Sequence, residues 1–137
     1  MTAIVVDASV VVDFLVDVSA GAAAVRARLL GEASPWVAPE LMDAEVAHVM
    51  RGQALRGEIS TAVANLSLAE LIALPLQRYP HRPLLQRAFA LRDNATVYDA
   101  LYIALAEVLD VPLLTRDAAL ARVPGVAVPV EVIAPVG

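Results

Sequence analysis

The sequence contains no cysteine and no lysine among its 137 residues. Without cysteine, the chain can form neither a disulfide framework nor a cysteine-ligated zinc or iron site. Arginine is therefore the only strongly basic residue, with 10 copies against 15 acidic residues and a net charge of −5. This balance argues against a sticky, nonspecific nucleic-acid binder. It does not exclude a specific one, because four acids gathered around a metal ion would leave a nearly neutral surface.

Aromatic residues and long apolar runs are also scarce. Aromatics make up 4% of a chain that is 59% hydrophobic, so the core must consist mainly of alanine, valine and leucine. No apolar run reaches the roughly 18 residues of a membrane span without meeting a charge or a proline. The start, "MTAIVVDASVVVDF", has no basic leader, which fits neither a signal peptide nor a transit peptide. These features predict a cytoplasmic, non-membrane protein with a single domain over residues 1–137.

Short apolar runs alternate with helical patterns along the chain. Strands are predicted at residues 3–6 and within "WVAP", "LPLQRYPHRP", "VPLLT" and "GVAVPV". The predicted helices are, in chain order, 9–15, 19–30, 39–56, 60–73, 84–92, 96–109 and 116–123. Ser9 and Ser60 are expected as helix caps, and Pro39 as the first residue of its helix. The alternation predicts an α/β fold, in which helices cover both faces of a parallel sheet and ligands bind at the carboxyl ends of its strands.

Two aspartates follow predicted strands. Asp7 comes directly after "AIVV", and Asp117 lies just beyond "PLLT". If the two strands are parallel neighbours, both carboxylates emerge at the same edge of the sheet. Taken singly, each is explained as well by a turn or helix cap, which aspartate often provides.

Helical periodicity selects one of three acids in the helix predicted at 39–56. The apolar stripe of this helix is expected to be Met42, Val46 and Val49. Glu45 lies at its border, together with Leu41 and His48. Glu40 and Asp43 point well away and are expected to face solvent. Glu45 is therefore the acid predicted to face inward.

The stretch "TVYDALYIALAEVL", residues 96–109, carries Asp99 on a face that is otherwise made to be buried. Its neighbours on that face are Tyr102, Ile103 and Ala106. Burying an unpaired carboxylate costs roughly several kcal/mol. Asp99 must therefore be protonated, paired with another group, placed at the mouth of a cavity, or bound to a metal. A hydrogen bond to a buried backbone group or a tyrosine is the plain alternative.

Together, Asp7, Glu45, Asp99 and Asp117 form a candidate set of four inward carboxylates. Such a set would raise the pKa of its own members unless a cation lies between them. An all-oxygen set suits Mg²⁺ or Mn²⁺ better than Zn²⁺. Clusters of this kind commonly act on phosphodiesters, where the metal activates water and neutralises the phosphate.

Several polar residues beside these acids have secondary predictions. Ser9 and Thr115, each two residues from a predicted ligand, would orient carboxylates or metal waters, or else serve as ordinary helix caps. Arg116 is either a contact for RNA phosphate or an exposed arginine without such a role. His48 and His81 are expected to be structural or exposed, and Asp13 is expected to face solvent. Asp93 and Asn94 lie near the motifs and their role is open, with a metal or RNA contact as one alternative for Asp93.

Four motifs occur in order across nearly the whole chain: "VVDASV", "APELMDAEVAHVM", "LRDNATVYDALYIALAE" and "PLLTRDAAL". Together they resemble the PIN-domain ribonucleases, specifically the VapC toxins of bacterial type II toxin–antitoxin pairs. The resemblance implies a three-layer α/β/α fold with a short parallel sheet and a pocket that binds Mg²⁺ or Mn²⁺. It assigns the four acidic positions to Asp7, Glu45, Asp99 and Asp117. It also implies a homodimer and a VapB-type antitoxin that blocks the pocket.

The leading hypothesis is thus a divalent-metal endoribonuclease toxin, in which a metal-activated water hydrolyses RNA. One alternative is a non-catalytic binding module on the same scaffold. The other is a Mg²⁺-dependent phosphoacceptor receiver domain. The receiver reading is weak because it requires an acidic pair near the first strand and a late lysine, and Asp7 is followed by Ala8 in a chain without lysine.

Overall fold

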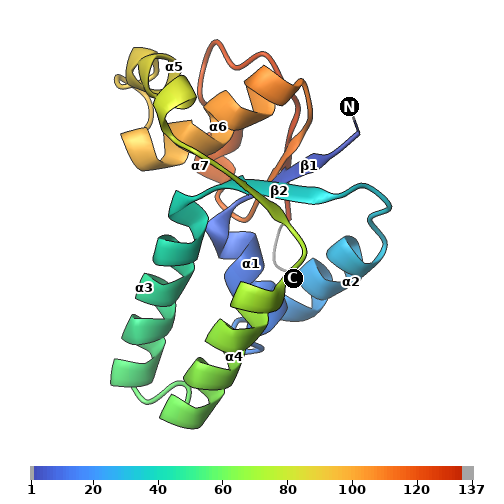
Figure 1. Cartoon of the computed structure of the whole chain (residues 1–137), viewed down its shortest axis with the longest axis vertical. Coiled ribbons are helices and arrows are strands. Elements are labelled where there is room, and N and C mark those ends of the chain that lie inside the picture. The colour runs from blue at the N-terminus through green and yellow to red at the C-terminus, as the bar shows by residue number, and fades with distance from the viewer. Residues whose placement is uncertain (1, 134–137) are drawn as a thin grey trace.

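Five short strands form one parallel sheet at the centre of the molecule (Figure 1). The structure is a computed structural model and describes residues 2–133. The strands are β1 (Ile4–Val6), β2 (Trp36–Pro39), β3 (Gln77–Tyr79), β4 (Leu113–Thr115) and β5 (Val130–Val132). Their order is β3-β2-β1-β4-β5, with β1 paired to both β2 and β4. The carboxyl ends of β1 and β4 therefore lie side by side, as the placement of the acids requires.

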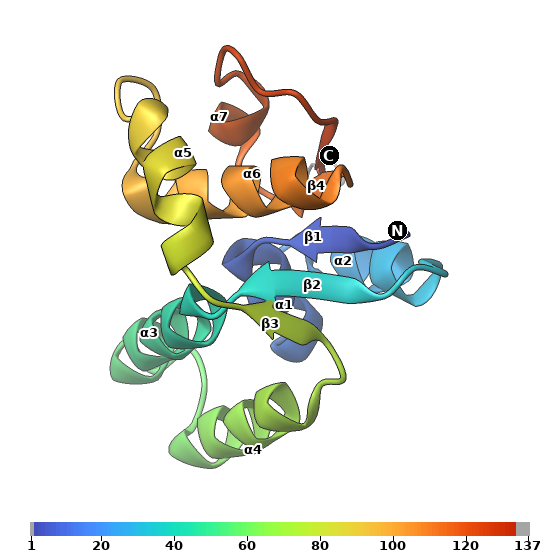
Figure 2. The ribbon, with the colours of Figure 1, turned by 45° about the horizontal axis from the view of Figure 1, so that its top comes forward.

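Helices cover both faces of the sheet, which confirms the predicted three-layer fold. They are α1 (Ala8–Leu15), α2 (Ala22–Leu30), α3 (Leu41–Leu55), α4 (Thr61–Ala73), the 3-10 turn η1 (Arg82–Leu84), α5 (Leu85–Ala90), α6 (Val97–Leu109) and α7 (Ala118–Ala121). Figure 1 shows α5 and α6 above the strands and α1, α2, α3 and α4 below them, and Figure 2 shows α3 and α4 beside β3 on the side away from α5 and α6. None of the helices described is long and apolar enough to cross a membrane.

The core is built on β1, β4 and α6. All three residues of β1 and all three of β4 are buried. In α6, seven consecutive residues from Ala100 to Ala106 are buried, including the large side chains of Tyr102 and Ile103. A helix buried on nearly all sides has no solvent stripe. This explains why the sequence of α6 shows so little polar character outside its ends.

Some element boundaries differ from the predictions. Pro39 ends β2 instead of starting a helix, because β2 continues its pairing with β3 up to Tyr79. Ser9 is not a cap, since Asp7 occupies the N-cap position of α1. Ser60 does cap α4, and its hydroxyl accepts a hydrogen bond from the amide of Val63.

Two further boundaries were wrong by several residues. Helix α2 begins at Ala22 and not at residue 19, and the last strand lies at Val130–Val132 and not within residues 125–130. Pairing with β4 fixes the position of β5, and this tertiary constraint is not visible in local sequence. The strand order also excludes the receiver alternative, since receiver domains have the order 2-1-3-4-5.

Candidate metal-binding active site

Asp7 sits where β1 ends and α1 begins, beside the end of β4. Its amide donates a hydrogen bond to the carbonyl of Leu114 at 3.0 Å, which locks the two strand ends together. The side chain is only 7% exposed. Asp7 is thus a nearly buried carboxylate at the carboxyl edge of the sheet, as predicted.

Two hydroxyl groups hold the Asp7 carboxylate. Ser9 Oγ and Thr115 Oγ1 both donate to Asp7 Oδ2, at 3.0 and 2.7 Å. The same hydroxyl oxygens accept backbone amides, that of Arg116 on Ser9 and that of Asp117 on Thr115. Ser9 and Thr115 therefore both contact Asp7, and the network fixes the orientation of its carboxylate.

Glu45 projects from α3 and accepts a hydrogen bond from a residue that was not predicted to contact it. The hydroxyl of buried Tyr102, on α6, donates a hydrogen bond to Glu45 Oε1 at 2.5 Å. The clue in the sequence was a tyrosine one turn after Asp99 on a buried face, because a buried tyrosine hydroxyl usually finds a partner. The Tyr102 hydroxyl therefore binds Glu45 and is not the hydrogen-bond partner of Asp99.

The inner face of α3 differs slightly from the predicted stripe. Met42, Val46 and Met50 are buried, whereas Val49 is 40% exposed and faces a cavity. Glu45 lies at the border of the buried stripe, as the periodicity indicated.

Asp99 and Asp117 occupy the N-terminal ends of two helices. Asp99 lies in the first turn of α6, and its amide donates to the side chain of Thr96, which caps the helix. Asp117 caps α7 by accepting the amide of Ala119 on Oδ1 at 2.9 Å. The capping alternative for Asp117 is thus correct, and its carboxylate lines the same cavity as the other three acids.

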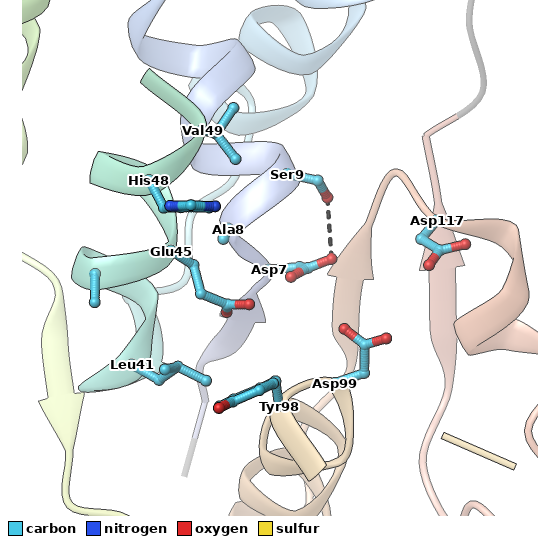
Figure 3. A pocket seen from close by; sticks show the side chains of 11 residues that line it. Asp7, Ala8, Ser9, Leu41, Glu45, His48, Val49, Tyr98, Asp99 and Asp117 are labelled. Atoms are coloured by element: carbon cyan, nitrogen blue, oxygen red, sulfur yellow. Dashed lines mark hydrogen bonds between the residues drawn. The ribbon is translucent and has the colours of Figure 1, made fainter. Parts of the chain in front are cut away.

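All four predicted acids line one cavity of about 640 Å³, whose wall is formed by Asp7, Ala8, Ser9, Leu41, Ala44, Glu45, His48, Val49, Tyr98, Asp99 and Asp117. Figure 3 shows the four carboxylates arranged around it, with Glu45 on the side of α3 and Asp117 on the opposite side. Four separate segments of the chain therefore deliver one acid each to the same space.

Burial and mutual repulsion raise the pKa of three of these carboxyl groups. Burial raises the pKa of Asp7, against the lowering effect of its two hydroxyl partners. Burial and the charges of Asp7 and Asp99 raise the pKa of Glu45. Burial and the charges of Asp7 and Asp117 raise the pKa of Asp99. A cation between the groups would remove the repulsion and favour their charged forms.

The four acids offer only oxygen donors, which are the ligands that a hard divalent cation prefers. Within residues 2–133, no group of three acidic or histidine side chains is placed to hold one metal ion. Mg²⁺ is usually held by only one or two carboxylates and keeps several waters, so the cavity fits an ion held in that way. The candidate ligands are Asp7, Glu45, Asp99 and Asp117.

Asp13 and Arg116 are placed differently from the predictions. Asp13 was expected to face solvent, but it is buried and forms an ion pair with Arg116. The guanidinium also approaches Ser19 Oγ, and its side chain is 15% exposed. Arg116 does not line the cavity, so the structure brings the four acids together without it.

Other polar residues also find defined places. His81 accepts the amide of Leu41 on Nε2 at 2.8 Å, a structural role. His48 is exposed and lines the cavity. Asp43, expected to be solvated, forms two hydrogen bonds with Arg78. Asp93 and Asn94 lie exposed in the turn before α6.

A comparison with protein families identifies the family of this chain. The family model described as "PIN domain" matches residues 4–126. This chain belongs to the PIN domain family. This chain is 47% identical to Ribonuclease VapC1 of Mycobacterium tuberculosis, in an alignment that covers 94% of this chain and 96% of the relative. It is 40% identical to Ribonuclease VapC12 of the same organism, covering 96% and 99%.

Solved structures show the same fold. The protein PAE2754 from Pyrobaculum aerophilum matches this PIN domain with a TM-score of 0.68 and 21% identity, covering 96% of this chain and 84% of that one. The structure of VapBC2 from Rickettsia felis, bound to a DNA fragment from its promoter, matches with a TM-score of 0.64 and 13% identity, covering 94% and 97%. At these identities the likeness establishes the PIN fold alone.

Proposed function

We propose that this protein is a metal-dependent endoribonuclease of the VapC toxin class. The observation that carries the proposal is the convergence of Asp7, Glu45, Asp99 and Asp117 on one cavity from four separate segments. Relatives that match nearly the whole chain, at 47% and 40% identity, are named ribonucleases.

The four acids would have different roles in the reaction. Asp7, fixed by Ser9 and Thr115, and Asp99, at the start of α6, lie between Glu45 and Asp117 in Figure 3 and would hold the cation. Glu45, anchored through one oxygen by Tyr102, would orient the attacking water and accept its proton. A raised pKa suits that role, because a general base works best when its pKa lies near the working pH.

When bound, a divalent ion supplies positive charge that neutralises the phosphate and activates water. Asp7 and Asp99 would hold it directly, and Glu45 and Asp117 would complete the acidic set around it. Mg²⁺ is the expected ion and Mn²⁺ a substitute. Water attacks phosphorus, and the bond from phosphorus to the 3′ oxygen breaks. The products carry a 5′-phosphate and a 3′-hydroxyl end.

Partners and location follow from the same class. A VapB-type antitoxin would cover the cavity and block access to it, and the toxin would act as a homodimer in the cytoplasm, where its RNA substrate lies. A toxin–antitoxin complex is among the solved structures that match this fold. Co-expression with a VapB-type antitoxin, followed by size-exclusion chromatography of the complex and of the isolated chain, tests both assemblies.

The direct test is cleavage of labelled total RNA by purified protein in Mg²⁺ or Mn²⁺, with EDTA as the control. Discrete products with 5′-phosphate ends, absent in EDTA, support the nuclease. A folded, antitoxin-free protein that binds RNA without cutting it in either metal would instead support the non-catalytic binding module.

A further inference from the structure

The cavity has an apolar side that the four carboxylates do not use. Leu41, Ala44 and Val49 line it from α3, and Tyr98 lines it from α6. Figure 3 shows Tyr98 beside Leu41, with His48 on the far side of Glu45. The wall therefore combines aliphatic side chains with two planar rings, directly next to the acids.

Tyr98 is unusually exposed for an aromatic residue. Its side chain is 62% exposed, whereas Tyr102, one turn later on the same helix, is fully buried and bonded to Glu45. Tyr98 thus contributes little to the core. It immediately precedes Asp99, so the backbone that places an acid in the cavity also places this ring at its wall.

In the described chain, the side chains that line the cavity include acids but no arginine, so they offer RNA phosphate no positive charge. Six of the ten arginines are engaged in ion pairs with acids: Arg26, Arg28, Arg56, Arg78, Arg87 and Arg116. In the proposed nuclease the bound cation would neutralise the phosphate, so contact with the rest of the nucleotide must come largely from the uncharged surface of the cavity.

From these observations we infer that the apolar side of the cavity is a nucleobase subsite in which Tyr98 stacks on an unpaired base next to the cleaved bond. The inference rests on the proposed nuclease function. Proteins that recognise RNA specifically mostly target unpaired bases, which stack on aromatic and histidine side chains. A base held in a duplex cannot enter a cavity of this kind, so the substrate class is single-stranded or looped RNA.

The test compares variants and substrates in one steady-state assay. The substrate is an RNA oligonucleotide that the wild-type protein cleaves at one bond, prepared intact and with an abasic nucleotide on either side of that bond. Tyr98→Ala removes the ring, Tyr98→Phe keeps it, and Phe89→Ala removes a comparably exposed aromatic, 59% exposed, that does not line the cavity.

Loss of the stacking of one base on an aromatic ring should raise KM about tenfold or more, with a smaller change in kcat. We expect this rise for Tyr98→Ala, recovery for Tyr98→Phe, and wild-type behaviour for Phe89→Ala. One of the abasic substrates should raise the KM of the wild type similarly but leave that of Tyr98→Ala unchanged, because the two changes remove the same contact. Annealing a complementary strand over the site should abolish cleavage.

Equal KM values for the wild type and Tyr98→Ala, or full additivity of the ring and base deletions, would overturn the subsite while the nuclease itself still stands. Failure of the wild type to cleave any RNA in Mg²⁺ or Mn²⁺ would instead overturn the proposed function, and the subsite with it. Circular dichroism and a melting curve for each variant show whether the fold is retained.

Discussion

Tyr102 and Glu45, separated by 57 positions in the sequence, are joined by a hydrogen bond from the tyrosine hydroxyl to the carboxylate at 2.5 Å. This bond ties α6 to α3 across the cavity. It also lowers the pKa of Glu45 against the raising effects of burial and of the neighbouring acids. The position and the ionisation of one acid thus depend on a buried residue of another helix.

We predict that Tyr102→Phe weakens catalysis without unfolding the protein. The ring keeps its packing, but Glu45 loses a hydrogen bond to a charged group, worth about 1.5–3 kcal/mol. The pKa of Glu45 should then rise further, so kcat should fall about tenfold or more and the acidic limb of the pH–rate profile should move to higher pH.

Tyr79→Phe is the matched control for this change. Tyr79 lies on β3, is partly buried, and does not line the cavity. Its variant should retain the wild-type rate and pH profile. An unchanged pH profile in Tyr102→Phe would contradict the assigned role of the hydroxyl.

Gly21 allows the buried pair of Arg116 and Asp13 to form. A Cβ atom added at Gly21 would lie 2.2 Å from Arg116 Nη1, far inside contact distance, although the backbone at Gly21 is unstrained. We predict that Gly21→Ala displaces the guanidinium and weakens its ion pair with Asp13, at a cost of about 1–3 kcal/mol. Urea unfolding measures this loss.

Gly31→Ala is the control, because a Cβ there would meet only backbone oxygens at 3.5 Å or more. Its free energy of unfolding should stay within about 1 kcal/mol of the wild type. Equal effects of the two substitutions would show that the close approach of Arg116 to Gly21 does not matter for stability.

The raised pKa values of Asp7, Glu45 and Asp99 predict how stability depends on pH when no metal is bound. Above the unfolded pKa of about 4, the folded state binds more protons at these groups than the unfolded state does. Their contribution therefore becomes unfavourable as the pH rises through the raised values. The metal-free protein should lose stability from mildly acidic to neutral pH, and Mg²⁺ should restore it.

Ion-paired glutamates act in the opposite direction but at lower pH. The backbone amide of Ser34, and then Arg28, lower the pKa of Glu32, and Arg87 lowers the pKa of Glu107. The stabilisation from these contacts is therefore complete above about pH 5 and is lost only below it. Urea midpoints in EDTA between about pH 5 and 8 isolate the cavity acids. Asp99→Asn should flatten the decline, and a wild-type midpoint that rises steadily to pH 8 would contradict the prediction.

Much of the site could be predicted because its positions follow local rules. Apolar runs marked the strands, and the acids after β1 and β4 had to emerge at one edge of a parallel sheet. The period of α3 singled out Glu45, and the apolar face of α6 made Asp99 conspicuous. Each of these inferences needed only a few neighbouring residues and the geometry of one element.

The features that were missed depend on contacts between distant segments. Asp13 pairs with Arg116 across 103 positions, and no local pattern distinguishes such a pair from two solvated charges. Pro39 joins a strand because β3 lies beside it, although its position before a helical pattern suited a helix start equally well. Tyr102 could be expected to need a partner, but the sequence did not reveal which acid it would meet.

The most direct measurement compares RNA cleavage by Asp99→Asn and Asp110→Asn with that by the wild type, at saturating Mg²⁺. Both variants remove one negative charge from the same helix, but Asp110 is exposed at its far end, in a left-handed conformation that asparagine tolerates. The account predicts a loss of about 10²-fold or more for Asp99→Asn and wild-type cleavage for Asp110→Asn. Equal cleavage by Asp99→Asn and the wild type would contradict it.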